Sequence, residues 1–116
     1  MLVPVKSPSF TVDGSTSFNS AGGICVPDRP GIYFIRDFRG VLYIGRTENL
    51  KRRFNQHLWN CSNPNIDKAR KYPVGKTEFC WMLLEFGKQA EKEKELINYF
   101  QPPCNRTLSK KKRGVI

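Results

Sequence analysis

The sequence predicts one small α+β domain, in which a β-hairpin, a buried strand and two amphipathic helices share a core. Two runs of β-branched and aromatic residues, 32–35 and 41–44, flank five residues that end in a glycine, which is typical of a hairpin. Residues 77–86 are densely apolar and aromatic, as expected of a buried central strand. Apolar residues then recur at helical spacing after the hairpin and again over 88–100. A chain of 116 residues is long enough for one modest core.

The hairpin carries one tyrosine near the middle of each strand. We expect Tyr33 and Tyr43 to lie opposite each other, although a slip of one residue in the register would separate them. Gly31 begins the first strand and Gly45 ends the second. Taken singly, both tyrosines could be core aromatics with solvated hydroxyls, and both glycines could be ordinary turn residues.

The first helix is expected after Gly45, with Thr47 and Glu48 as its cap and first turn. Arg53 and His57 are one helical turn apart and border its apolar stripe, so they are placed to face the hairpin. A basic surface helix with one packed histidine remains an alternative. The stripe itself consists of Leu50, Phe54, Leu58 and Cys61.

The second helix is expected from Lys88 to Phe100, because two prolines follow it. On a helical projection, Glu93 falls at the centre of the apolar stripe, near Ala90 and Ile97. A carboxylate in that place is costly unless a cation pairs with it. Glu93 is therefore either a functional carboxylate or half of an ion pair with Arg53 or another cation.

The chain carries a formal net charge of +10, from 20 Lys or Arg and 10 Asp or Glu residues. These charges are spread along the chain, which favours a polyanionic partner, and nucleic acid is the most common one. No basic amphipathic helix with a large apolar face supports a membrane surface instead.

The four cysteines are far apart and form no C-x-x-C pair, so the spacing does not favour a zinc site. We expect reduced thiols and no disulfides, with Cys61 and Cys80 packed inside. No export signal or long apolar run is evident, so we expect a soluble protein of the cytoplasm, or of the nucleus in a eukaryotic source.

Three regions follow from composition. Residues 1–29 are rich in Ser, Pro and Gly and are expected to form a loosely structured arm, in which 9–12 could add an edge strand. Residues 30–105 hold the domain, including a short helix over 66–71 after Asn63-Pro64. Residues 106–116 form a basic tail, in which Lys110, Lys111 and Lys112 are expected to contact phosphates.

The ordered motifs resemble those of the GIY-YIG nuclease family over residues 30–105. The resemblance starts with Gly31-Ile32-Tyr33 and Tyr43-Ile44-Gly45, which match the paired tripeptides of that family. It continues with Arg53, His57, Glu93 and the closing Pro102-x-x-Asn105. Two positions depart or vary: Cys104 replaces a common aromatic residue, and the role of Arg46 is less fixed.

The resemblance implies a three-stranded antiparallel sheet flanked by helices and an endonuclease that hydrolyses DNA with one Mg²⁺ or Mn²⁺ ion. Glu93 would hold the ion, and Arg53 would neutralise charge at the phosphate. Tyr33 would orient or deprotonate the attacking water, with its pKa lowered by nearby cations. Tyr43 would bind the phosphate or Tyr33, and His57 would shuttle a proton.

Arg46, Lys51, Arg52 and Asn105 complete the expected nucleic-acid surface, although Asn105 is expected to tie the helix end to the site more than to touch the substrate. Two other functions remain open: a non-catalytic nucleic-acid-binding module of the same fold, and a nuclease that acts on RNA. No separate recognition domain is evident, so we expect a nuclease that is weakly sequence-specific, that depends on DNA shape or strandedness, or that acts as a homodimer or with a partner protein that supplies specificity.

Overall fold

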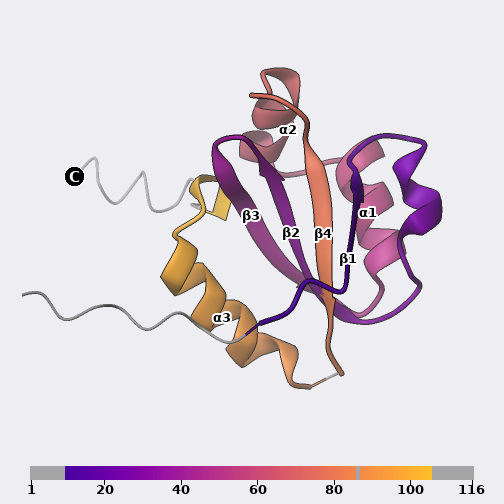
Figure 1. Ribbon diagram of the computed structural model, residues 1–116, viewed down its shortest axis with the longest axis vertical. Coiled ribbons are helices and arrows are strands. Elements are labelled where there is room, and N and C mark those ends of the chain that lie inside the picture. The colour runs from indigo at the N-terminus through magenta and orange to yellow at the C-terminus, as the bar shows by residue number, and fades with distance from the viewer. Residues whose placement is uncertain (1–9, 86, 106–116) are drawn as a thin grey trace, which may run out of the picture.

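The computed structural model describes residues 10–85 and 87–105. Four antiparallel strands form one sheet in the order β1-β4-β2-β3 (Figure 1). The strands are β1 (Gly14–Ser17), β2 (Gly31–Asp37), β3 (Gly40–Thr47) and β4 (Glu78–Leu83). The helices are α1 (Leu50–Trp59), α2 (Pro64–Lys71) and α3 (Gln89–Phe100), with short 3-10 turns η1 (Gly22–Cys25) and η2 (Pro103–Asn105).

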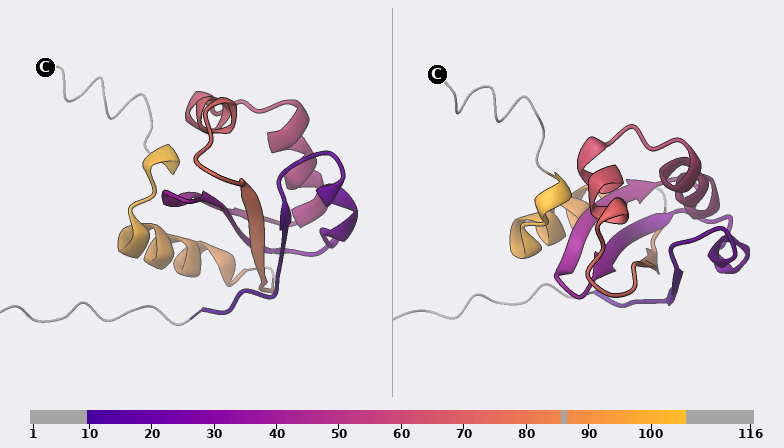
Figure 2. Two further views of the ribbon diagram at one scale, coloured as in Figure 1. Left: turned by 45° about the horizontal axis from the view of Figure 1, so that its top comes forward. Right: turned by 90° about the horizontal axis from the view of Figure 1, so that it is seen from above.

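The two faces of the sheet carry separate apolar clusters. One cluster joins β2, β3 and β4 to α1, α2 and the segment 18–26, and it is centred on buried Tyr33, Phe54 and Phe79. The other joins the opposite face to α3 through Ile44 and Leu96. Figure 2 shows α3 on one side of the sheet and α1 with α2 on the other. The sheet therefore separates the two helical layers.

The predicted sheet is confirmed as antiparallel, but it has four strands rather than three. The additional strand β1 pairs with β4 through Gly14–Ser17, whereas the sequence suggested an edge strand over 9–12. Phe18 and Val26 are buried in the core. The expectation of a loosely structured arm therefore does not describe residues 10–29, because this segment pairs with β4 and fills the core.

The hairpin is confirmed, but its expected register is wrong. Tyr33 pairs with Gly45, and Tyr43 pairs with Ile35. The turn is shorter than predicted, since Asp37 and Gly40 already pair, and an irregularity follows after Ile35. Together these features shift the two tyrosines apart along their strands.

The helices agree well with the predicted ones. Helix α1 begins two residues later than Thr47 suggested, because Asn49 is its cap. The side chain of Asn49 accepts a hydrogen bond from the backbone N–H of Arg52 (2.9 Å). Asn63 caps α2 in the same way, with Pro64 in the first turn. Helix α3 ends at Phe100 before the two prolines, as predicted.

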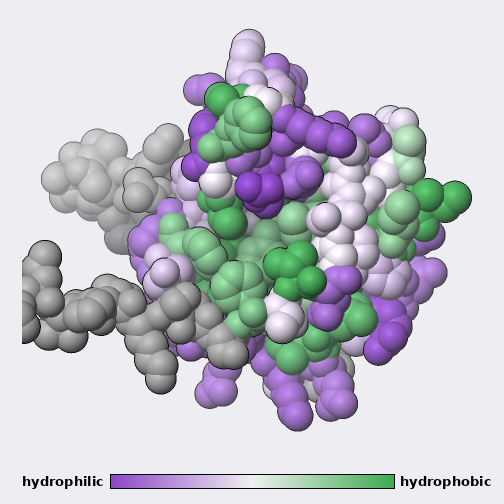
Figure 3. Space-filling view, in the orientation of Figure 1, coloured by the Kyte–Doolittle hydropathy of each residue, from purple (hydrophilic) through white to green (hydrophobic). Residues whose placement is uncertain are grey.

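Apolar side chains are partly exposed on the face of the sheet that α3 covers incompletely, and Figure 3 shows them beside a polar surround. The cysteines are free thiols, and Cys80 is buried while Cys61 is partly buried, as the sequence indicated. Among the described residues, no helix has the length and apolar character that crossing a membrane requires.

Candidate active site

Strands β2 and β3 and helix α1 bring three of the predicted site residues together. Tyr33 and Tyr43 face α1, with their ring centroids 5.9 Å apart. His57 lies against both rings, at 5.4 Å from Tyr33 and 5.6 Å from Tyr43. The sequence predicted that α1 faces the hairpin along this edge, and the contacts confirm it. Three polar side chains are thus held at one edge of the core.

Tyr33 and His57 share a direct hydrogen bond. The phenol oxygen of Tyr33 lies 2.7 Å from Nε2 of His57, inside the protein. The other ring nitrogen, Nδ1, lies 3.9 Å from Sγ of Cys61. Tyr33 has no exposed surface and His57 is 8% exposed, so this pair is almost shielded from bulk water. His57 is therefore packed in the core, as one alternative had it. It also faces the hairpin and bonds to Tyr33, as the other alternative had it.

Burial sets the protonation of both partners. It raises the pKa of Tyr33 well above the ordinary value, with a further increase from Tyr43, and Arg53 opposes this only weakly. Burial, together with the charges of Arg53 and Arg70, lowers the pKa of His57 to about 4. At neutral pH the bond thus joins a neutral phenol and a neutral imidazole. The expected lowering of the pKa of Tyr33 by neighbouring cations is not met, because burial outweighs Arg53 and His57 is uncharged.

Tyr43 is the more accessible of the two phenols. Burial raises its pKa as well, while the hydroxyl of Tyr33 lowers it and the charge of Glu93 raises it. The side chain remains partly exposed at the protein surface. A ligand outside the core can therefore reach Tyr43 more easily than Tyr33.

Arg53 supplies a permanent cation beside these aromatic rings. Its Nε atom is buried and has no hydrogen-bond partner. No carboxylate among residues 10–85 and 87–105 forms an ion pair with it. Arg53 and His57 also line a cavity of about 290 Å³, together with Gln56, Asn60 and Ser62. A guanidinium that lacks an internal anion at the wall of a cavity is suited to an external one.

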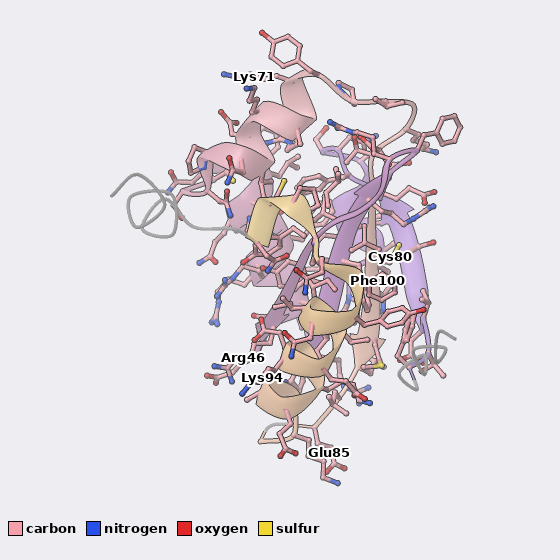
Figure 4. All side chains as sticks on the ribbon, turned by 90° about the vertical axis from the view of Figure 1, so that its left-hand side faces the viewer. Arg46, Lys71, Cys80, Glu85, Lys94 and Phe100 are labelled. Carbon is pink, nitrogen blue, oxygen red and sulfur yellow. The ribbon has the colours of Figure 1, made fainter. Side chains whose placement is uncertain are left out.

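Arg46 and Glu93 face each other on the α3 side of β3. The Nε atom of Arg46 lies 3.3 Å from Oε1 of Glu93, and the Glu93 side chain is 22% exposed. Burial raises the pKa of Glu93, while Arg46 lowers it. The sequence placed Glu93 at the centre of an apolar stripe, but α3 meets the sheet at its edge, so the carboxylate is only half-buried. The alternative of an ion pair is met, with Arg46 as the cation. Figure 4 shows Arg46 on the same side as the first half of α3.

Asn105 closes the open edge of β3. Its Oδ1 accepts a hydrogen bond from the backbone N–H of Ile44 (2.8 Å), and its Nδ2 donates one to the carbonyl of the same residue (2.8 Å). Edge strands otherwise leave such groups unpaired. The contact holds the strand between Tyr43 and Gly45, which agrees with the expectation that Asn105 ties the chain to the site. Its expected contact with nucleic acid stays a prediction.

The other predicted contacts are more remote. Lys51 and Arg52 lie in the first turn of α1, where Arg52 is exposed. Their role in binding nucleic acid stays a prediction. The basic residues Lys110, Lys111 and Lys112 lie outside the described residues.

Sequence reasoning missed Arg70, which fixes the end of α1. Its Nη1 atom donates to the carbonyls of His57 (3.2 Å) and Leu58 (3.1 Å), and its guanidinium lies over the ring of Phe18. These contacts satisfy carbonyls that a helix end leaves free. Only the basic character of residues 66–71 was visible in the sequence, and nothing there indicated which cation turns toward α1.

The protein is an α+β domain with a cluster of tyrosine, histidine and arginine side chains at one edge of its antiparallel sheet. Comparison with known proteins gives its family. Residues 29–107 match the model of the GIY-YIG catalytic domain, so the chain belongs to this family. The chain is 31% identical over 85 residues to UvrABC system protein C of Clostridium perfringens strain SM101, covering 72% of this chain and 14% of that protein. It therefore spans only a small part of these curated relatives.

Solved structures of the N-terminal GIY-YIG endonuclease domain of UvrC from Thermotoga maritima have the same fold. The domain bound to its catalytic magnesium has a TM-score of 0.60 at 18% identity, covering 72% of this chain and 91% of that chain. A point mutant bound to the catalytic divalent cation has a TM-score of 0.60 at 16% identity and covers 73% and 91%. At 16% and 18% sequence identity, this similarity shows a shared fold and nothing further.

The residues present fit a single divalent cation. Within the described part of the chain, no group of three or more His, Cys, Asp or Glu residues is arranged to hold a metal. Mg²⁺ is often bound through one or two carboxylates, with water and substrate phosphates as its other ligands. A half-buried carboxylate at Glu93, with a raised pKa, offers one such ligand.

Proposed function

We propose that this domain is an endonuclease that hydrolyses phosphodiester bonds of DNA with the help of Mg²⁺ or Mn²⁺. The observation that carries the proposal is Arg53, a partly buried arginine whose Nε atom has no hydrogen-bond partner and whose charge has no partner anion among the described residues. It lies on the helix that carries His57, next to the two tyrosines. A phosphodiester brings the anion that this guanidinium lacks. The net charge of +10 supports a polyanionic substrate.

Each side chain has a distinct task in this proposal. Arg53 binds the scissile phosphate and neutralises the charge that grows on it during attack. Tyr43 is partly exposed and orients the attacking water or the phosphate, while the buried Tyr33 and His57 hold its surroundings in place. Glu93 holds the cation, which when bound polarises the phosphate and stabilises the leaving 3′ oxygen.

The difference in solvent exposure between Tyr33 and Tyr43 favours different roles for the two residues. Because His57 is neutral at pH 7, its imidazole holds the hydroxyl of Tyr33 through an uncharged hydrogen bond. Water must reach the phenol that orients it, and Tyr43 is reachable while Tyr33 is enclosed. The direct contact with water is therefore assigned to Tyr43, and Tyr33 acts through its bond to His57.

The test is cleavage of matched substrates with and without Mg²⁺. Supercoiled plasmid, single-stranded DNA, branched DNA and RNA of the same sequence should be incubated with the protein, with EDTA as the blank. Cleavage of DNA that requires the cation supports the proposal. Binding without cleavage on every substrate would instead indicate a non-catalytic module, and cleavage of RNA alone would assign a different substrate.

Arg53→Met tests the anion site separately. It should abolish cleavage, whereas Asn55→Ala, at an exposed position of the same helix, should retain it. The chain supplies one Glu93, so cutting both strands of a duplex needs two chains or two successive encounters. A plasmid that passes through a nicked form before it is linear would indicate successive cuts.

A further inference from the structure

A bulge in β3 turns two consecutive side chains toward the same face of the sheet. Ile35 of β2 pairs with Tyr43, and the next residue of β2 pairs with Val41, so one residue of β3 is left over. That residue is Leu42, and it packs in the same cluster as Tyr43. Val41 lies in the cluster on the opposite face. Bulges often re-aim a side chain next to an active site, and here the bulge extends the surface that starts at Tyr43.

Leu42 lines a cavity of about 500 Å³ between the β2–β3 turn, α2 and η2. Most of the cavity wall is apolar and includes Ala69, Pro103 and the buried Cys104. Tyr72 also lines it, and this ring is 71% exposed, so it stands at the opening. The volume lies within the usual range for small-ligand pockets, roughly 300–1,000 Å³. We call this cavity the Leu42 pocket.

Among the described residues, the Leu42 pocket is bordered by cations and by no carboxylate. Arg39 and Lys68 line it. Arg39 forms an ion pair with Asp37, with its Nη2 atom 2.6 Å from Oδ2, so the carboxylate offsets its charge. The exposed Lys68 forms no ion pair with any residue of 10–85 or 87–105. An aromatic ring, an apolar wall and an uncompensated cation together match a nucleotide, whose base is flat and apolar on its faces and whose phosphate is anionic.

The Leu42 pocket adjoins the candidate active site at two points of the chain. Leu42 precedes Tyr43 directly, and Cys104 precedes Asn105, whose amide binds the backbone of Ile44. A DNA strand with its phosphate at Arg53 and Tyr43 can therefore place a neighbouring nucleotide at the pocket. This continuity favours a nucleotide of the substrate over a peptide or a free metabolite.

We propose that the Leu42 pocket binds one unstacked base of the substrate strand next to the scissile phosphate, with the base on Tyr72 and its phosphate at Lys68. The proposal rests on the proposed function and adds a preference for the substrate. A base inside a duplex has to leave its stack to enter the pocket, whereas a base in a single strand or at a flap does not. The domain therefore selects DNA that carries an unpaired nucleotide beside the cut.

Binding measured in EDTA tests the Leu42 pocket without cleavage. Fluorescence anisotropy should compare single-stranded DNA with fully paired duplex of the same sequence. Tyr72→Ala should weaken binding of the single strand by roughly 5- to 100-fold, the usual effect of one lost base–aromatic stack, and leave the duplex unaffected. Tyr72→Phe keeps the ring and should bind like the unmodified protein. Tyr99→Ala on α3 is the matched control and should also behave like it.

A fluorescent base locates the occupant. 2-Aminopurine, placed at successive positions of the single strand, should change its emission at one position next to the cut, and Tyr72→Ala should remove that change. Lys68→Gln should make the salt dependence of single-strand binding shallower by about 0.7 units, as for one lost phosphate contact.

The outcomes separate the Leu42 pocket from the proposed function. One outcome is that DNA is cut, but Tyr72→Ala weakens binding of single strand and duplex equally or leaves both unchanged. The pocket then does not hold a base, and the nuclease assignment stands. A protein that neither binds nor cuts DNA overturns both. An unpaired strand that is bound through Tyr72 but never cut supports the pocket and contradicts the nuclease assignment.

Discussion

The ring of Tyr33 lies across Gly45, its cross-strand partner in β3. A Cβ atom added to Gly45 would stand 2.4 Å from both Oη and Cζ of Tyr33. Only glycine therefore lets the phenol pass over β3 and reach His57. This contact gives a physical reason for the two glycine-tyrosine tripeptides: the tyrosine of the first needs the glycine of the second.

Gly45→Ala should destabilise the protein by about 1–3 kcal/mol, since a methyl group would be forced against a rigid, buried ring. Chemical denaturation gives the change in the free energy of unfolding. In a Tyr33→Ala background the same substitution should cost much less, because the ring is gone. Equal losses in both backgrounds would show that the contact between Tyr33 and Gly45 is not the cause.

Asn105→Ala should expose the backbone of Ile44 at the open edge of the sheet. Two hydrogen bonds are lost, each worth about 1 kcal/mol, so stability should fall by roughly 1–2 kcal/mol. Amide hydrogen exchange at Ile44 should accelerate, while exchange at Phe34, inside the sheet, should change much less. The exposed Asn55→Ala on α1 is the matched control. Unchanged exchange at Ile44 would contradict the clamping role of Asn105.

His57 should make the protein less stable in mild acid. Its pKa is about 4 in the folded protein and about 6.5 when unfolded, so the unfolded state binds the proton more readily. Its contribution is fully present above pH 6.5 and is lost as the pH falls through about 4. The difference amounts to on the order of 3 kcal/mol. The free energy of unfolding of His57→Gln should lack this fall. Parallel pH profiles for both proteins would refute the buried, neutral histidine.

The basic tail should set salt dependence without affecting chemistry. Removing residues 109–116 deletes four cations. If all four contact phosphates, the slope of log K against log salt on duplex DNA should become shallower by up to about 3.6 units. The turnover rate at saturating DNA should stay the same, because Arg53, Tyr43 and Glu93 are untouched. An unchanged slope would mean that the tail does not bind DNA.

The sequence predicted the helices because their apolar residues recur at helical spacing, and the central strand because residues 77–86 are densely apolar. Strand β1 escaped prediction because its residues, Gly-Ser-Thr-Ser, have little strand character of their own and depend on pairing with β4. The hairpin register failed for a similar reason, since neither the short turn nor the extra residue Leu42 has a signature in the sequence.

The candidate site was predictable as a set of residues but not as a geometry. Helical spacing placed Arg53 and His57 beside the hairpin, as the structure has them. It also placed Glu93 in the core, whereas α3 lies along the edge of the sheet and leaves the carboxylate half-buried beside Arg46. The enclosure of Tyr33 and the contacts of Arg70 depend on how the layers meet, which one-dimensional periodicity does not contain.

Cleavage by Glu93→Gln tests the central claim most directly, because the amide keeps the shape of the side chain and removes the charge that would hold the cation. The matched control is Glu91→Gln, an exposed carboxylate on the same helix. With Mg²⁺ and single-stranded or branched DNA, Glu93→Gln should show no cleavage while its DNA binding and unfolding midpoint stay close to those of the unmodified protein, and Glu91→Gln should cut normally. Full cleavage by Glu93→Gln would contradict a metal-dependent nuclease centred on this carboxylate.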